Sequence, residues 1–197
     1  MSDKSDNQKP AEHYSLLLAE LKKLKTDYKK LSELVHTDSL TGLNNYRHFC
    51  TAIEQEMERC RRTGQPLVLI MLDYDHFKQV NDNWGHNNGN RALILLASCL
   101  RNTLRKFDTA CRYGGEEFSI ILPNTNLMTG VRVAERLRRT IASTPLTIDE
   151  NQSIALTISL GVAAYKGNKE DTAEQLVKLA DAQLYRAKKE GRNRVCH

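Results

Sequence analysis

The chain has 197 residues, 40% of them hydrophobic, which suits one globular domain with an additional segment. Its net charge of +5 fits a mildly basic soluble protein, and we expect no nucleic-acid partner. Because no apolar run approaches the roughly 20 residues that cross a bilayer, and the five cysteines show no Cys-x-x-Cys spacing for a disulfide framework or zinc site, we expect a cytoplasmic protein without a membrane segment.

The N-terminal segment predicts a coiled coil. Residues 1–10 are polar and aperiodic, so we expect a disordered leader there. Residues 11–36 then place apolar side chains at alternating steps of three and four, at Tyr14, Leu17, Leu21, Leu24, Tyr28, Leu31 and Val35. This narrow seam predicts a parallel two-stranded stalk that makes the protein a homodimer. A single amphipathic helix packed on its own domain would also fit the pattern.

A polar turn at residues 38–45 follows the stalk, and we place the globular domain at residues 37–197. Apolar residues then recur at helical spacing over residues 46–62. The run Pro66–Leu72 is short and wholly apolar, which is typical of a strand buried on both faces of a sheet.

Two acids follow that strand directly, Asp73 and Asp75. A carboxylate at the end of a buried strand is costly unless it is solvated or binds a cation, so Asp73 is a candidate metal ligand. For Asp75 we expect a simpler role, which is to cap the helix that begins at His76.

Residues 91–106 predict a strongly apolar helix that ends beside Arg105 and Asp108, which alone would be read as a helix-end charge pair. Two β-prone runs, 109–113 and 118–122, then flank Gly-Gly-Glu-Glu, which predicts a hairpin with Glu116 and Glu117 near its tip. Without other motifs to support it, a hairpin tip of this kind is more often a solvated turn than a catalytic or binding site.

The last third of the chain predicts helices over residues 127–141 and 172–190, and a strand over residues 154–164. One face of that strand carries large side chains and the other small ones, so a helix could approach the small face closely. The order of all these elements predicts an α/β sandwich with a largely antiparallel sheet.

Taken together, the motifs resemble the GGDEF family of diguanylate cyclases. The matching stretches, in the family's order, are Asp38–Asn45, Asp73–Asp82, Gly85–Asn90, Arg105–Asp108, Gly114–Phe118 in a Gly-Gly-Glu-Glu-Phe form, and Tyr185–Asn193. They span about four fifths of the chain. The resemblance implies the palm-like fold of nucleotidyl cyclases, with a central five-stranded sheet flanked by helices.

The resemblance also implies roles for individual residues. Asp73, the main-chain carbonyl of Tyr74 and Glu116 would hold Mg²⁺ or Mn²⁺, and Glu116 and Glu117 would be catalytic. Substrate binding would fall to Phe77 and Lys78 at the phosphates, Asn81 and Asn90 at guanine, and Lys188 and Arg192 at the β- and γ-phosphates. An inhibitory site for the cyclic product would consist of Arg105, Asp108 and Arg136.

Two positions depart from the family pattern. Tyr46 stands where Arg is usual, so either Arg47 pairs with Asp38 or the junction is looser. Asn90 stands where Asp is usual; an amide offers one acceptor fewer to guanine, which costs about 1–3 kcal/mol and weakens base selectivity.

The implied activity is condensation of two GTP into cyclic di-GMP with release of two pyrophosphates, by a dimer that its product inhibits. Two alternatives remain open: a related cyclase that makes a mixed cyclic GMP-AMP, and a catalytically silent module that binds cyclic dinucleotides. The enzymatic interpretation requires that positions 73 and 116 meet in the fold.

Overall fold

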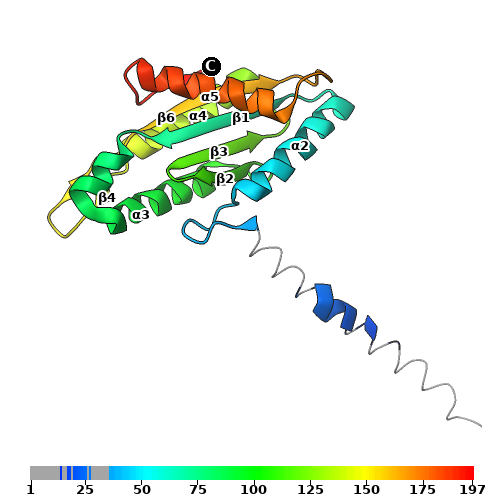
Figure 1. Cartoon of the computed structure of the whole chain (residues 1–197), viewed down its shortest axis with the longest axis horizontal. Helices are drawn as coiled ribbons and strands as arrows, with labels where there is room; N and C mark the ends of the chain where they lie inside the picture. Colours follow the sequence, from blue (N-terminus) through cyan, green and yellow to red (C-terminus); the bar gives the residue numbers. More distant parts are fainter. Residues whose placement is uncertain (1–13, 15–16, 19, 26, 28–35) are drawn as a thin grey trace, which may run out of the picture. The chain divides into compact units, whose positions relative to one another are not determined.

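The structure is a computed structural model and describes residues 14, 17–18, 20–25, 27 and 36–197 (Figure 1). The chain divides into two compact units, Met1–His36 and Thr37–His197. Within the described residues, no helix is both long enough and apolar enough to cross a membrane.

The first unit is helical at the described positions before residue 36. Four side chains of the predicted seam are exposed there, namely Tyr14, Leu17, Leu21 and Leu24. The leader, residues 1–10, and the seam positions Tyr28, Leu31 and Val35 lie outside the described residues. Dimerisation through this segment therefore stays a prediction.

The second unit is built on a five-stranded sheet in the order β2-β3-β1-β6-β7. Its strands are β1 (Leu67–Tyr74), β2 (Thr109–Gly114), β3 (Glu117–Leu122), β6 (Ile158–Tyr165) and β7 (Val195–Cys196). Three of the four pairings are antiparallel and only β6–β7 is parallel, so the largely antiparallel sheet is confirmed. All eight residues of the central strand β1 are buried, as its continuous apolar sequence predicts.

Helices cover both faces of this sheet (Figure 1). Alternate residues of β1 contribute to two cores, one on each face. One face packs against α3 (Phe77–Thr103) and α4 (Leu127–Ala142). The other face packs against α2 (Tyr46–Thr63) and α5 (Ala173–Lys189). Odd-numbered residues of β1 face α2 and α5, and this parity places Asp73 on their side of the sheet.

Helix α5 lies very close to strand β6 at Gly161, on the small face that the alternation predicted. A Cβ atom at position 161 would collide with the α5 backbone at Ala180 and Leu184. The glycine therefore sets the distance between helix and sheet.

The strand predicted over residues 154–164 is shorter than expected. Strand β6 begins at Ile158, because Ser153–Ile154 forms β5 and pairs with β4 (Leu146–Thr147) in a separate two-stranded sheet. Alternating hydrophobicity runs through both strands, so the pattern hides the break between them.

The two helices predicted before and after Gly85 are joined end to end in α3. Gly85 interrupts them with a left-handed φ of 76°. The kink returns the chain so that Gly89 lies against the side chain of Asn81, where any Cβ atom would collide with the amide.

Candidate functional site

Asp73 and the acids of the hairpin lie side by side on one face of the sheet. In the β1–β3 ladder Asp73 is paired with Glu117, and directly opposed residues place their side chains on the same face. Burial, together with the charges of Glu116 and Glu117, raises the pKa of Asp73 to about 6 against the opposing hydrogen bond and charge of Lys188. The two stretches therefore meet, as the enzymatic interpretation requires.

A cation from α5 completes this cluster. Lys188 Nζ lies 3.0 Å from Asp73 Oδ2, and the Asp73 side chain is only 7% exposed. The close approach of α5 at Gly161 brings the lysine within reach. The structure thus joins a predicted metal ligand to a predicted phosphate ligand.

The donor set fits a divalent cation of the Mg²⁺ type. Asp73 faces the negative charges of Glu116 and Glu117, carboxylate oxygens are ligands that Mg²⁺ prefers, and Lys188 is the cation that the described residues place against Asp73. Among the described residues, no three His, Cys, Asp or Glu side chains are already grouped as ligands of a metal ion, so the ligand set that the family resemblance implies also relies on the main-chain carbonyl of Tyr74. The side chain of Tyr74 is engaged on the α3 side of the sheet, because its hydroxyl donates to Ala92 O at 2.7 Å.

The expected role of Asp75 as a helix cap is wrong. The residue before α3 is His76, with a left-handed φ of 56° and no capping side-chain bond. Asp75 is buried instead and accepts hydrogen bonds from Thr157, Ser159 and the backbone of Asn193. Phe77 and Lys78 are nonetheless in the first turn of α3, where free backbone N–H groups favour an anion.

The predicted guanine ligands come from either side of the kink in α3. The Asn81 side chain lies against Gly89, and Asn90 follows it on the exposed surface. Gly85 and Gly89 therefore bring the two asparagines into one neighbourhood, as the sequence prediction requires.

Arg192 belongs to a tight turn after α5. Gly191, Arg192 and Asn193 have φ values of 113°, 60° and 46°. The backbone N–H of Arg192 donates to Ala187 O at 3.0 Å, which ends the helix, and its side chain is exposed.

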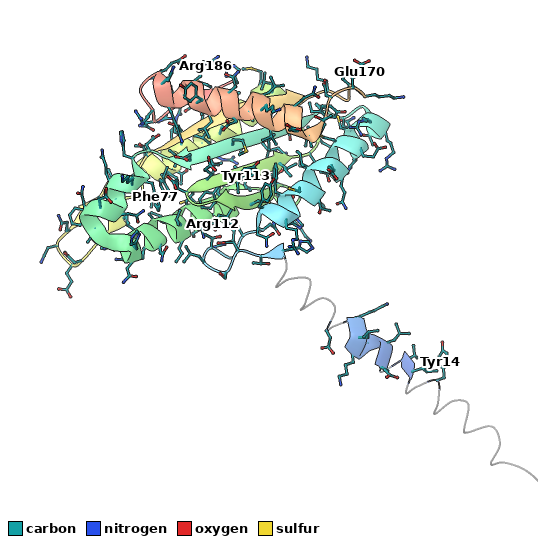
Figure 2. All side chains as sticks on the ribbon, viewed as in Figure 1. Tyr14, Phe77, Arg112, Tyr113, Glu170 and Arg186 are labelled. Atoms are coloured by element: carbon teal, nitrogen blue, oxygen red, sulfur yellow. The ribbon has the colours of Figure 1, made fainter. Side chains whose placement is uncertain are left out.

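Arg112 is a site residue that the sequence prediction missed. Its Nε donates to Gly115 O at 2.9 Å and its Nη1 pairs with Asp38 Oδ2 at 3.2 Å, so it ties the hairpin tip to the turn before α2 (Figure 2). Burial alone would raise the pKa of Asp38, but hydrogen bonds from Thr41 and the charge of Arg112 lower it. The arginine stands directly before Tyr113-Gly114-Gly115, a position that should have drawn attention to it.

Neither expectation for Asp38 is correct, because Arg112 and not Arg47 pairs with it and the junction is closely held. The Arg112 N–H donates to Asn44 O at 2.8 Å. Tyr46 packs edge-on against Tyr113 with ring centroids 4.9 Å apart. An aromatic contact thus occupies the position where arginine was expected.

The three predicted inhibitory residues gather around the end of α3. The Asp108 carboxylate accepts from the Arg105 backbone at 2.8 Å, and Arg136 Nη2 donates to Thr103 O at 2.7 Å. Arg105 and Asp108 also line a cavity of about 300 Å³. Its ligand stays a prediction.

Comparisons with known proteins match most of this chain. Residues 35–194 match the family model described as diguanylate cyclase, GGDEF domain. Diguanylate cyclase DgcP of Pseudomonas aeruginosa is 43% identical over 159 residues, which cover 81% of this chain and 23% of DgcP. The uncharacterized protein YhcK of Bacillus subtilis is 41% identical over 170 residues, which cover 86% of this chain and 47% of YhcK. The chain spans less than half the length of these curated relatives.

A solved structure extends the likeness to three dimensions. The crystal structure of the coiled coil and GGDEF domain of DgcB from Caulobacter crescentus, in complex with c-di-GMP, matches with a TM-score of 0.84 and 29% identity. The match covers 94% of this chain and 97% of that chain. It confirms the predicted palm-like fold.

Proposed function

The chain belongs to the family of diguanylate cyclases that share the GGDEF domain, and from that premise we propose that it condenses two GTP into cyclic di-GMP and releases two pyrophosphates. In this chain the family motif takes the form Gly-Gly-Glu-Glu-Phe at residues 114–118. The observation that carries the proposal is the convergence of Asp73, Glu116 and Glu117 beside Lys188.

The acids divide the work between charge and proton transfer. Asp73, Glu116 and the Tyr74 carbonyl would hold Mg²⁺ or Mn²⁺, and the ion would supply positive charge against the triphosphate of the substrate. Glu116 accepts the proton of the attacking ribose 3′-hydroxyl, and Glu117 supports the same charge cluster. Catalysis of this kind depends mainly on positioning and electrostatic stabilisation.

The substrate is held from three directions. Backbone N–H groups at Phe77 and Lys78 bind phosphate at the start of α3. Lys188 leaves Asp73 and, with Arg192, binds the β- and γ-phosphates. Asn81 and Asn90 contact the guanine edge.

Two such half-sites must face each other, because joining two nucleotides twice requires each site to act on the other's substrate. The N-terminal stalk raises the effective concentration of one half-site near the other. DgcB, which matches this chain over most of its length, has a coiled coil and was solved with c-di-GMP. By analogy we place product inhibition at Arg105, Asp108 and Arg136, which the structure gathers around one end of α3.

Asn90 supports a second candidate, a cyclase of relaxed base selectivity that also makes cyclic GMP-AMP. The amide presents a donor where a carboxylate would accept from guanine. In this case Asn90→Asp should shift the product back toward cyclic di-GMP when both nucleotides are supplied.

The test is incubation of the purified protein with Mg²⁺ and GTP, with and without ATP, followed by mass spectrometry. We expect cyclic di-GMP, and we expect Glu116→Gln to abolish it. Glu170→Gln is the matched control, since Glu170 is an exposed carboxylate in the loop before α5 (Figure 2). A mixed product would favour the second candidate, and no product at all would favour a silent module that binds cyclic dinucleotide.

A further inference from the structure

Asp75 is a buried carboxylate whose oxygens are fully engaged by donors of this chain. Only 6% of the residue is exposed. Its Oδ1 accepts from Ser159 Oγ at 2.6 Å, and its Oδ2 accepts from Thr157 Oγ1 at 2.7 Å and from the Asn193 N–H at 2.9 Å. Buried charge is tolerated only when hydrogen bonds replace its water, and these three bonds do so.

These bonds join three separate stretches of the chain. Thr157 directly precedes β6, and Ser159 is the second residue of that strand. Asn193 belongs to the turn after α5. The Asp75 N–H also donates to Thr157 O at 2.9 Å. Asp75 therefore locks the end of β1 to both β6 and the C-terminal turn.

The locked turn has an unfavourable backbone. Arg192 and Asn193 both have left-handed φ values, 60° and 46°, although neither is glycine. Such conformations persist only where surrounding contacts determine them. The bond from the Asn193 N–H to Asp75 is one of these contacts, and it acts on the residue next to Arg192.

We propose that Asp75 is a positioning residue that fixes the C-terminal turn so that Arg192 points at the phosphates of the bound nucleotide. This inference rests on the proposed function, in which Arg192 binds phosphate. Asp75 stands two residues after Asp73, so one short piece of chain sets both the metal ligand and the turn that carries the phosphate ligand. Its oxygens already accept three bonds, which argues against a second role as a metal ligand.

The test is a double-mutant cycle between Asp75 and Arg192, read as the dissociation constant for 3′-deoxy-GTP with Mg²⁺ by isothermal titration calorimetry. This analogue lacks the attacking hydroxyl, so it binds without reacting. We expect Asp75→Ala and Arg192→Ala each to weaken binding about tenfold or more, because each removes a charge-assisted phosphate contact or its support. The double variant should bind within about threefold of Arg192→Ala alone, because coupled residues are not additive.

A conservative variant separates positioning from stability. Asp75→Asn keeps an oxygen for the Asn193 N–H, and the Ser159 hydroxyl can turn to accept from the new amide, so binding should stay within about threefold of wild type. Thr125→Val is the matched control, since it removes a buried hydroxyl (Thr125 is 5% exposed) beyond the far end of β3, and it should lower the melting temperature without changing the dissociation constant.

Independent, additive losses in the cycle would overturn the proposal, and so would equal losses for Asp75→Ala and Asp75→Asn. Failure of the wild-type protein to bind 3′-deoxy-GTP would instead overturn the proposed function itself. Circular dichroism of each variant confirms that the compared proteins are folded.

Discussion

Asp73 is the residue on which the proposed metal site depends most. Its carboxyl is buried and faces the charges of Glu116 and Glu117, with Lys188 as partial compensation. The shift of its pKa from 3.8 to about 6 corresponds to roughly 3 kcal/mol between the two protonation states. Ionised Asp73 therefore carries an electrostatic cost, which the proposed cation would relieve.

This cost predicts the pH dependence of Asp73→Asn. A raised carboxyl pKa means that the folded state binds the proton more tightly than the unfolded state, so the wild-type free energy of unfolding falls as pH rises from about 4 to about 6. Without metal, the variant should therefore gain stability relative to wild type across this range and keep a gain on the order of 1–3 kcal/mol above pH 6.

Urea unfolding at several pH values, in a metal chelator, measures this difference. Glu170→Gln serves as the control, since it also removes one carboxylate, at an exposed position in the loop before α5. A variant that is less stable than wild type at pH 7 would mean that the Lys188 pair outweighs the burial of Asp73.

The packing of α5 on β6 decides whether the site is assembled. Gly161 lets the helix backbone approach the strand, and the same helix carries Lys188 to Asp73. A side chain at position 161 would push the helix away and separate the two charges.

Gly161→Ala should therefore lower the free energy of unfolding by about 1–3 kcal/mol or more, as overpacking does, and weaken nucleotide binding as well. Ala164→Ser is the matched control on the same strand. It adds a single oxygen atom on the face of β6 that points away from α5. Chemical denaturation and 3′-deoxy-GTP titration check both effects, and an unchanged affinity in a destabilised Gly161→Ala would show that α5 does not position the site.

The sequence could predict those elements whose signal is local. The apolar run of β1, the hairpin around Gly114 and the small face around Gly161 all follow from periodicity and composition. Contacts between distant residues carry no such signal, and this is why the Arg112–Asp38 pair was missed and the role of Asp75 misjudged. Strand β7 has two residues, too few for any periodic pattern.

The proposed reaction requires two catalytic domains that face each other. The exposed seam residues Tyr14, Leu17, Leu21 and Leu24 are the surface that a partner helix would cover. In the proposed reaction each second unit, Thr37–His197, would supply one half-site, so activity should follow dimerisation.

We predict that Leu17→Gln with Leu24→Gln raises the dimer dissociation constant about a hundredfold or more, because burial of each leucine contributes about 1.5–3 kcal/mol. In this double variant, the rate of product formation per protomer should fall when the protein is diluted and should recover at high protein concentration. Lys23→Gln with Lys25→Gln is the control outside the seam. Sedimentation equilibrium measures the dimer, and a variant that stays dimeric would place the interface elsewhere.

The most direct test of the central claim, that Asp73 and Glu116 together hold a divalent cation beneath the nucleotide, is the Mg²⁺ dependence of 3′-deoxy-GTP binding. In the wild-type protein Mg²⁺ should tighten binding about tenfold or more, and Asp73→Asn and Glu116→Gln should each remove most of that gain. Retention of the full Mg²⁺ effect in either variant would contradict the account.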